Sequence, residues 1–247
     1  MNNVKNAKVA IVTGASRGIG AAIARRLASD GFAVVVNYAA SSKEADTLVE
    51  ALKSQGAAAI AVKADVSNAD DVRRMFETTE QQLGKVDVVV NNAGIMKTLP
   101  LADTSDALYT QTFDINVRGT FNTLREAAAR MNNGGRIVNF SSTTLALNMP
   151  GYAIYNATKA AVEAFTHVFA KELRGRDITV NAVAPGPVAT ALFLAGKTEE
   201  QIQNFAKMPP LQRLGRPEDI ASVVSFLAGP DSAWVNGQIL RANGGVA

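Results

Sequence analysis

The sequence contains no cysteine and only one histidine, and these absences exclude several kinds of functional site. Without cysteine the chain can form no disulfide, no thiolate metal site and no cysteine nucleophile. The single imidazole, that of His167, is too little for a metal centre or a Ser-His-Asp triad. We therefore expect no metal site, and we expect His167 to be an ordinary packed or exposed residue of a helix.

Net charge is low, and long apolar runs are absent. The 25 Lys and Arg against 22 Asp and Glu leave a formal charge of +3. The basic residues are scattered, often as pairs such as Arg25-Arg26, and form no stripe of the kind that binds nucleic acid. No run approaches the roughly 20 apolar residues of a membrane span, and KVAIVTG near the N-terminus is too short for a signal peptide. We therefore expect a soluble, cytoplasmic protein whose partner is a small molecule, with no nucleic-acid or membrane partner.

Short apolar segments alternate with helical patterns along the whole chain. Strands are predicted at residues 8–13, 33–37, 59–64, 86–91, 136–141, 178–183 and 238–242. Most of them lack polar alternation, which is typical of parallel strands covered on both faces. The predicted fold class is α/β: a single-domain Rossmann fold over residues 1–247, with a doubly wound, seven-stranded parallel sheet and helices on both faces. The Pro- and Gly-rich stretch at about 187–214 interrupts this pattern and is expected to form a substrate lid.

A glycine-rich loop, TGASRGIG at residues 13–20, follows the first predicted strand and opens a helix expected to stop at Gly31. In this position Gly14 permits a tight turn, Gly18 lets the backbone approach a pyrophosphate, and Gly20 lets the helix pack closely on the strand. The free N–H groups of the helix N-terminus attract phosphate. The spacing differs from the usual G-x-G-x-x-G, but its place between strand and helix predicts dinucleotide binding.

The second predicted strand ends in NYAASSK, residues 37–43, with no carboxylate before Glu44. NAD-binding folds usually place an acidic residue here for the ribose 2′-hydroxyl. A 2′-phosphate is instead favoured by cations and hydroxyls, which Arg17, Ser41, Ser42 and Lys43 offer. The alternative reading is that Ser-Ser-Lys only begins the next helix as an N-cap. NADP is predicted in preference to NAD.

Two tyrosines lie three residues apart in YAIYNATKAA, residues 152–161, and only Tyr155 has a lysine four residues on, Lys159. Residues i and i+4 share one face of a helix. A nearby ammonium favours the ionised phenol, so the pair predicts a pKa of Tyr155 below its usual value of about 10. Tyr152 has no such partner and is expected to pack or to form a pocket wall.

The sequence resembles the classical short-chain dehydrogenase/reductase family over essentially its whole length. The motifs that carry the resemblance are TGASRGIG (13–20), NNAG (91–94), Asn116 in DINVRG (114–119), Ser142 in NFSS (139–142), YNATK (155–159) and PGPVAT (185–190). Ser142 stands thirteen residues before Tyr155, as in the family. The phrase NYAASS at 37–42 is similar to the NADP-preferring branch.

The resemblance implies an NADP-dependent oxidoreductase with four catalytic residues. Tyr155 would act as general acid and base on a carbonyl or alcohol oxygen, assisted by Lys159 and by the positive ring of the oxidised cofactor. Ser142 would hydrogen-bond and orient the carbonyl oxygen. Asn116 would hold a water that links Lys159 to solvent, and Lys159 would also bind the nicotinamide ribose.

Further cofactor contacts follow by matching positions, with Asn91 expected to be structural. The full set predicted to bind the cofactor is Gly14, Ser16, Arg17, Gly18, Ile19, Gly20, Asn37, Tyr38, Ala39, Ser41, Ser42, Asp65, Val66, Asn92, Ala93, Gly94, Tyr155, Lys159, Pro185, Gly186, Val188 and Thr190.

The helix that carries the pair has two offset apolar stripes, Ala157, Ala161, Ala164 and Val168 in one and Val162, Phe165 and Phe169 in the other. A helix that is apolar over so wide an arc needs cover on two sides. The sheet supplies one cover. The resemblance implies that a partner subunit supplies the other, and a homotetramer is predicted.

The side chains expected to line the substrate pocket are largely apolar: Met96, Leu145, Leu147, Met149, Leu192, Phe193 and Leu194. They favour a hydrophobic or aromatic ketone, aldehyde or diketone, and the predicted function is NADPH-dependent carbonyl reduction. A 3-oxoacyl-carrier-protein reductase is the main alternative; Arg176 matches one of its basic positions, but the loop NNGG at 132–135 lacks the second. A non-catalytic NADP sensor is less favoured, because Tyr155 and Lys159 are both present. A sugar-nucleotide epimerase is also less favoured, because such proteins are expected to be longer and to have a different glycine spacing.

Overall fold

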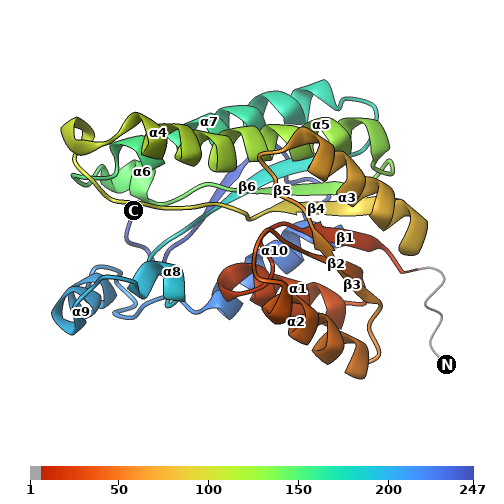
Figure 1. The fold of residues 1–247 in the computed structure, drawn as a ribbon, viewed down its shortest axis with the longest axis horizontal. Coiled ribbons are helices and arrows are strands. Elements are labelled where there is room, and N and C mark those ends of the chain that lie inside the picture. The colour runs from red at the N-terminus through yellow and green to blue at the C-terminus, as the bar shows by residue number, and fades with distance from the viewer. Residues whose placement is uncertain (1–6) are drawn as a thin grey trace.

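Seven parallel strands form one sheet in the computed structural model, which describes residues 7–247 (Figure 1). They are β1 (Val9–Val12), β2 (Ala33–Tyr38), β3 (Ala59–Lys63), β4 (Val86–Asn91), β5 (Arg136–Phe140), β6 (Thr179–Pro185) and β7 (Ile239–Ala242). All seven predicted strands are confirmed to within two residues at either end. The order is β3-β2-β1-β4-β5-β6-β7, so the winding reverses between β1 and β4. Ligands bind at this switch point in such sheets, beyond the carboxyl ends of the strands.

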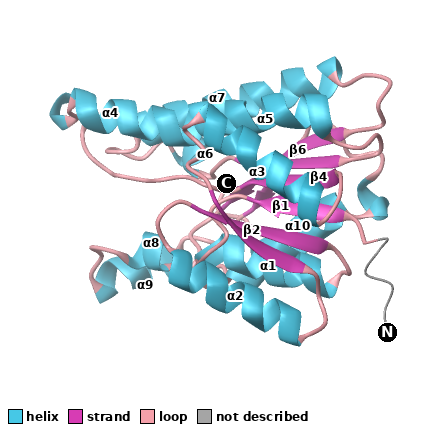
Figure 2. Ribbon diagram, turned by 45° about the vertical axis from the view of Figure 1, so that its right-hand side comes forward, coloured by secondary structure: helices cyan, strands magenta, loops and turns pink. Residues whose placement is uncertain are grey.

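Helices cover both faces of the sheet (Figures 1 and 2). One face carries α1 (Gly18–Ser29), α2 (Ser42–Ser54) and α10 (Pro217–Ala228), and the other carries α3 (Ala69–Gln82), α4 (Asp106–Phe113), α5 (Gly119–Arg130) and α7 (Ala153–Glu172). Successive residues of β2 belong to opposite hydrophobic clusters: Val34 and Val36 pack toward α1 and α2, and Val35 packs toward α3. Because both faces are buried, the strands show no polar alternation.

Three short helices lie at the carboxyl ends of the strands. They are α6 (Thr144–Leu147), α8 (Ala191–Leu194) and α9 (Glu199–Lys207). The last two fall inside the segment predicted as a lid, and they project beyond the sheet (Figure 2). The rings of Phe193 and Phe205 join them edge to face, with centroids 5.2 Å apart. No helix among residues 7–247 is long and apolar enough to cross a lipid bilayer.

The two apolar stripes of α7 have different surroundings. Val162 is buried, and Phe165 and Phe169 pack against the core on the sheet side. In the other stripe Ala164 is exposed and Val168 is 54% exposed. An apolar surface on α7 is therefore uncovered within one chain.

Candidate active site

Two adjoining cavities lie at the carboxyl edge of the sheet. The first, here called the loop cavity, measures about 400 Å³ and is bounded by the glycine loop and the ends of β2 and β4. The second, the tyrosine cavity, measures about 160 Å³ and is bounded by Ser142, Tyr155 and Lys159. Ile19 and Gly94 line both, so a long ligand in the first cavity would end beside the tyrosines.

Most residues predicted to bind the cofactor line these cavities. The loop cavity is lined by Gly14, Ser16, Arg17, Gly18, Ile19, Gly20, Asn37, Tyr38, Ala39, Ser41, Asp65, Val66, Asn92, Ala93, Gly94 and Thr190. Pro185, Gly186, Val188, Tyr155 and Lys159 line the tyrosine cavity. Ser42 lines neither, because it is already the first residue of α2. Ser41 is the N-cap residue of that helix, yet its side chain makes no capping hydrogen bond, which leaves the hydroxyl free for a ligand.

The glycine loop needs its glycines for space as well as for conformation. Gly14 and Gly18 have φ of +60° and +57°, in the left-handed region that side chains disfavour. A Cβ at Gly20 would lie 2.5 Å from the carbonyl oxygen of Gly14, a contact that no substituted residue can make. The backbone thus lies open at the point where a phosphate would approach.

Asn37 has a structural role that its sequence position did not indicate. Its side chain is buried, its Oδ1 accepts from the Gly14 N–H at 3.1 Å, and its Nδ2 donates to the carbonyls of Val62 and Ala64 at 3.3 and 3.0 Å. Its carbonyl also accepts from the Ala15 N–H at 2.8 Å. Asn37 therefore lines the cavity but uses its amide to tie the glycine loop to β3.

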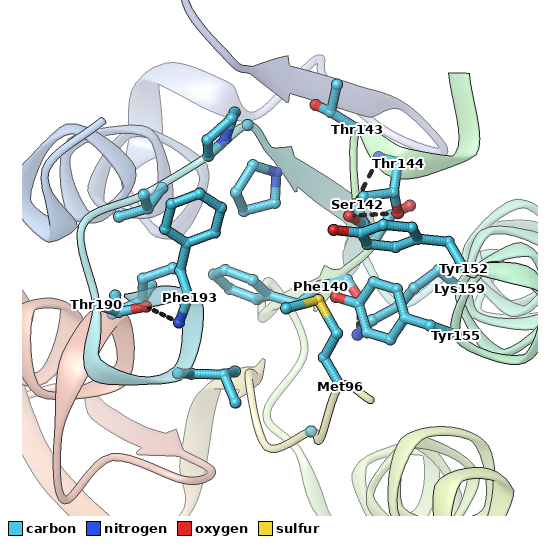
Figure 3. A pocket seen from close by; sticks show the side chains of 18 of the residues that line it. Met96, Phe140, Ser142, Thr143, Thr144, Tyr152, Tyr155, Lys159, Thr190 and Phe193 are labelled. Atoms are coloured by element: carbon cyan, nitrogen blue, oxygen red, sulfur yellow. Dashed lines mark hydrogen bonds between the residues drawn. The ribbon is translucent and has the colours of Figure 1, made fainter. Parts of the chain in front are cut away.

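Tyr155 and Lys159 project from the first turns of α7 into the tyrosine cavity (Figure 3). The Lys159 Nζ lies 5.6 Å from the centroid of the Tyr155 ring and donates to the Phe140 carbonyl at 2.8 Å. A Cβ at Gly94 would lie 3.2 Å from Asn116 Oδ1 and 3.7 Å from Lys159 Nζ. Glycine at position 94 therefore keeps room for the ammonium and the amide at the floor of the site.

Asn116 lies in a π-helical turn, Asp114–Arg118, that joins α4 to α5. Its buried amide exchanges hydrogen bonds with the N–H and C=O of Ile95, both at 2.9 Å, and donates to the Thr158 hydroxyl at 3.1 Å. Single π-turns inside helices often mark functional sites. Asn116 thus links the segment after β4 to α7, close to Lys159. Its part in a water relay stays a prediction.

Burial shifts the pKa of both groups of the pair. It raises the pKa of Tyr155 to about 12, and the neighbouring Ser142 hydroxyl opposes that rise. It lowers the pKa of Lys159 to about 8. The predicted fall in the pKa of Tyr155 is therefore wrong for the protein without a bound cofactor. Desolvation of the phenolate dominates, since the ammonium is itself poorly solvated and is directed at the Phe140 carbonyl.

Ser142 is held by a residue that the sequence reasoning missed. Its Oγ lies 2.9 Å from the Thr144 hydroxyl and accepts from the Thr144 N–H at 3.2 Å (Figure 3). With its lone pairs turned toward Thr144, the Ser142 hydroxyl is arranged to donate its proton into the cavity. Thr144 is itself fixed, because its carbonyl accepts from Asn156 Nδ2 at 3.0 Å.

Residues that the sequence set aside from catalysis have structural partners. His167 Nδ1 lies 2.9 Å from the Gly237 carbonyl oxygen on the surface. Ser141 donates to Glu163 at 2.5 Å. Asn91 donates to Asn139 at 2.8 Å, which ties β4 to β5 and confirms its structural role.

The predicted substrate wall is confirmed in part. Met96, Leu147, Met149, Leu192 and Phe193 line the tyrosine cavity, and Tyr152 is confirmed as a wall residue. Leu145 and Leu194 do not line it, although Leu147 and Phe193 of the same two short helices do. Phe140 at the end of β5 and Phe205 of α9 complete the wall; no local sequence signal distinguished them, since only tertiary folding brings them there.

Comparison with known proteins agrees with this geometry. Residues 14–247 match the family model described as enoyl-(acyl carrier protein) reductase. A short-chain type dehydrogenase/reductase of Picea abies is 45% identical, over 96% of this chain and 92% of that protein. A chloroplastic NADPH-dependent aldehyde reductase-like protein of Arabidopsis thaliana is 42% identical, over 96% and 93%. Versicolorin reductase 1 of Aspergillus parasiticus is 41% identical, over 99% and 98%.

Solved structures show the same architecture. A blue fluorescent protein from a metagenomic library, in complex with NADPH, superposes with a TM-score of 0.93 at 41% identity, covering 99% of this chain and 100% of that one. A short-chain dehydrogenase from Burkholderia cenocepacia in complex with NADP superposes with a TM-score of 0.92 at 36% identity, covering 99% of each chain.

Proposed function

Because the chain belongs to the short-chain dehydrogenase/reductase family, we propose that it is an NADPH-dependent carbonyl reductase that converts a ketone or aldehyde into the alcohol. The observation that carries this proposal is the convergence of Ser142, Tyr155 and Lys159 on an apolar cavity that adjoins the loop cavity. Relatives named as aldehyde, hydroxynaphthalene and versicolorin reductases support carbonyl reduction and favour an aromatic substrate.

The loop cavity fits a phosphorylated dinucleotide. Side chains are sterically excluded at Gly20, and the left-handed backbone at Gly14 and Gly18 turns the loop toward the N-terminus of α1. No carboxylate stands at the end of β2, where Tyr38 and Ala39 line the cavity together with the exposed Arg17 and with Ser41. Arg17 and Ser41 would hold the 2′-phosphate, as neighbours complexed with NADP or NADPH support. When bound, the cofactor supplies the hydride.

The residues of the tyrosine cavity would then bind and protonate the carbonyl oxygen of the substrate. Ser142 donates a hydrogen bond to the carbonyl oxygen and fixes its position. Tyr155 gives its proton to that oxygen as negative charge develops on it. A phenol with a pKa of about 12 is fully protonated at neutral pH, which favours the reductive direction. Lys159 stabilises the phenolate that remains, and the Phe193 and Phe205 lid would exclude water from the reaction.

The arginine that matches a carrier-protein reductase is held within the chain, which disfavours that alternative. The Arg176 guanidinium donates to the Ala128 and Met131 carbonyls and, at 3.0 Å, to Asn133 Oδ1. The nearby Arg130 pairs with Glu126 and with two glutamates of α3. Both cations at the end of α5 are thus engaged within the chain, and this supports a free small-molecule substrate.

Two further properties are proposed. The exposed stripe of α7 that includes Ala164 and Val168 supports assembly, and we infer a homotetramer. A cytoplasmic location is the accompanying expectation.

The function is tested by measuring oxidation of NADPH and NADH, side by side, with an aromatic ketone, a vicinal diketone, a quinone and an acetoacetyl thioester. NADPH-dependent reduction of the ketone or the diketone supports the proposal. Binding of NADPH without turnover of any carbonyl contradicts it and favours a non-catalytic sensor. Preferred turnover of the thioester favours the carrier-protein alternative.

Arg17→Gln is expected to raise KM for NADPH about tenfold and KM for NADH less than twofold, because a charged hydrogen bond to the 2′-phosphate is lost. Arg25→Gln is the matched control, since Arg25 is also exposed on the same stretch of chain but does not line the loop cavity. Equal changes in KM for the two cofactors would remove the phosphate contact assigned to Arg17.

Thr144→Val is expected to lower kcat about fivefold to tenfold, because Ser142 loses the hydroxyl partner that orients it and keeps only the Thr144 N–H. Thr144→Ser restores the hydroxyl and should keep most of the activity. Steady-state kinetics of both variants with one ketone provide the measurement. Full activity of the valine variant would show that Ser142 needs no support from this side.

A further inference from the structure

Tyr152 is a buried phenol that the mechanism leaves unused. It precedes the first turn of α7, is 8% exposed and lines the tyrosine cavity. Figure 3 shows its ring between Ser142 and Tyr155, with the Tyr152 and Tyr155 hydroxyls directed toward the same side of the cavity.

The Tyr152 hydroxyl has no hydrogen-bond partner in residues 7–247, whereas the serine and threonine hydroxyls that line the same cavity do. Ser142 bonds with Thr144, and Thr143 donates to the Ala184 carbonyl at 3.1 Å. The side chain is buried while its oxygen is open to the cavity, and tyrosine hydroxyls in such places usually pair with a polar atom. An unpaired donor on a nine-tenths buried side chain that faces a cavity therefore points to a ligand atom.

Tyr152 does not duplicate Tyr155. Position 156 is asparagine, so Tyr152 has no ammonium four residues on, and burial raises its pKa. Tyr152 is therefore a neutral O–H donor at ordinary pH, suited to holding an oxygen rather than to transferring a proton. Met96, Leu192 and Phe193 give the same cavity apolar side chains, so one extra donor there decides the orientation of a ligand.

We propose that Tyr152 binds a second oxygen of the substrate, next to the carbonyl oxygen held by Ser142 and Tyr155. The substrate class is then a carbonyl compound with a second carbonyl or hydroxyl group one or two carbons from the reacting one: a vicinal diketone, a hydroxyketone, or an aromatic ketone with an adjacent hydroxyl. This inference rests on the proposed carbonyl reductase function and makes Tyr152 a residue that determines specificity.

The test compares phenylpropanedione with phenylacetone, which carries a methylene in place of the second carbonyl. Values of kcat/KM with NADPH are measured for the wild type and for Tyr152→Phe. The ratio of kcat/KM for the diketone to that for phenylacetone is expected to fall about tenfold in the variant, the effect of one hydrogen bond. A purely structural role would lower both values together and leave the ratio unchanged, and that result overturns the inference.

A binding measurement separates this inference from the proposed function. The affinity of each ketone for the enzyme–NADPH complex is measured by the change in NADPH fluorescence. If the wild type reduces neither ketone, the proposed function fails. Selective weakening of diketone binding by Tyr152→Phe would still support the second-oxygen site. Equal affinities of the wild type and the variant for the diketone would overturn it. Tyr109→Phe, which removes an exposed phenol of α4 that lines neither cavity, is the control.

Discussion

Tyr155→Phe is expected to lower kcat for ketone reduction about a thousandfold while leaving the affinity for NADPH within a factor of two or three, because general acid catalysis is lost and the ring is kept. The phenylalanine occupies the same place beside Lys159, whose Nζ lies 5.6 Å from the ring. Stopped-flow or steady-state NADPH oxidation gives kcat, and fluorescence titration gives the affinity.

The neighbouring tyrosine makes this experiment sharper. If Tyr152 were the proton donor, Tyr155→Phe would leave most of kcat, and that outcome would contradict the role assigned to Tyr155. The Tyr109→Phe variant again controls for removal of a phenol elsewhere. A loss of kcat together with a loss of NADPH affinity would instead indicate that the substitution disturbs the glycine loop or Lys159.

Lys159→Met is expected to abolish most activity and yet to raise the free energy of unfolding of the dinucleotide-free protein at pH 7. The buried ammonium has a pKa of about 8, so below that pH the folded state carries a charge that solvent cannot stabilise. A shift from the ordinary value of about 10.5 down to about 8 corresponds to at most about 3 kcal/mol. Part of this is offset by the hydrogen bond to the Phe140 carbonyl, which methionine cannot make.

The pH dependence has a definite sign. Between pH 8 and pH 10.5 the unfolded lysine still binds a proton that the folded lysine has released, so the unfolding free energy of the wild type rises with pH. Lys159→Met should remove that rise. Urea denaturation at several pH values measures it, with Lys171→Met, at the exposed end of the same helix, as control. A variant that is less stable than the wild type at pH 7 would show that the Phe140 bond outweighs desolvation.

The fold could be predicted from the sequence because its signals are local. Each strand is a short apolar run, and the glycine loop between β1 and α1 places the binding edge before any contact is known. The residues proposed as catalytic could also be named from the sequence, because the spacing of Ser142, Tyr155 and Lys159 resembles that of the short-chain dehydrogenase/reductase family.

The remaining features depend on contacts between distant segments. The amide of Asn37 is consumed by Gly14, Val62 and Ala64, which no spacing rule reveals. The pKa of Tyr155 was predicted from one neighbour, whereas burial by several elements decides it. Phe205 reaches the cavity only because α9 folds back over it.

The hydrogen bonds of the Asn37 side chain also limit how the coenzyme preference of this protein can change in evolution. A carboxylate at the end of β2 is the usual way to select NAD, but at position 37 it would face the Val62 and Ala64 carbonyls instead of their present amide donor. That change would set like partial charges against each other and remove the two hydrogen bonds that the amide donates. A historical switch of coenzyme would therefore have to begin at Tyr38 or Ala39, whose side chains are not committed to the loop, and ancestral sequences should show the acidic residue arising there first.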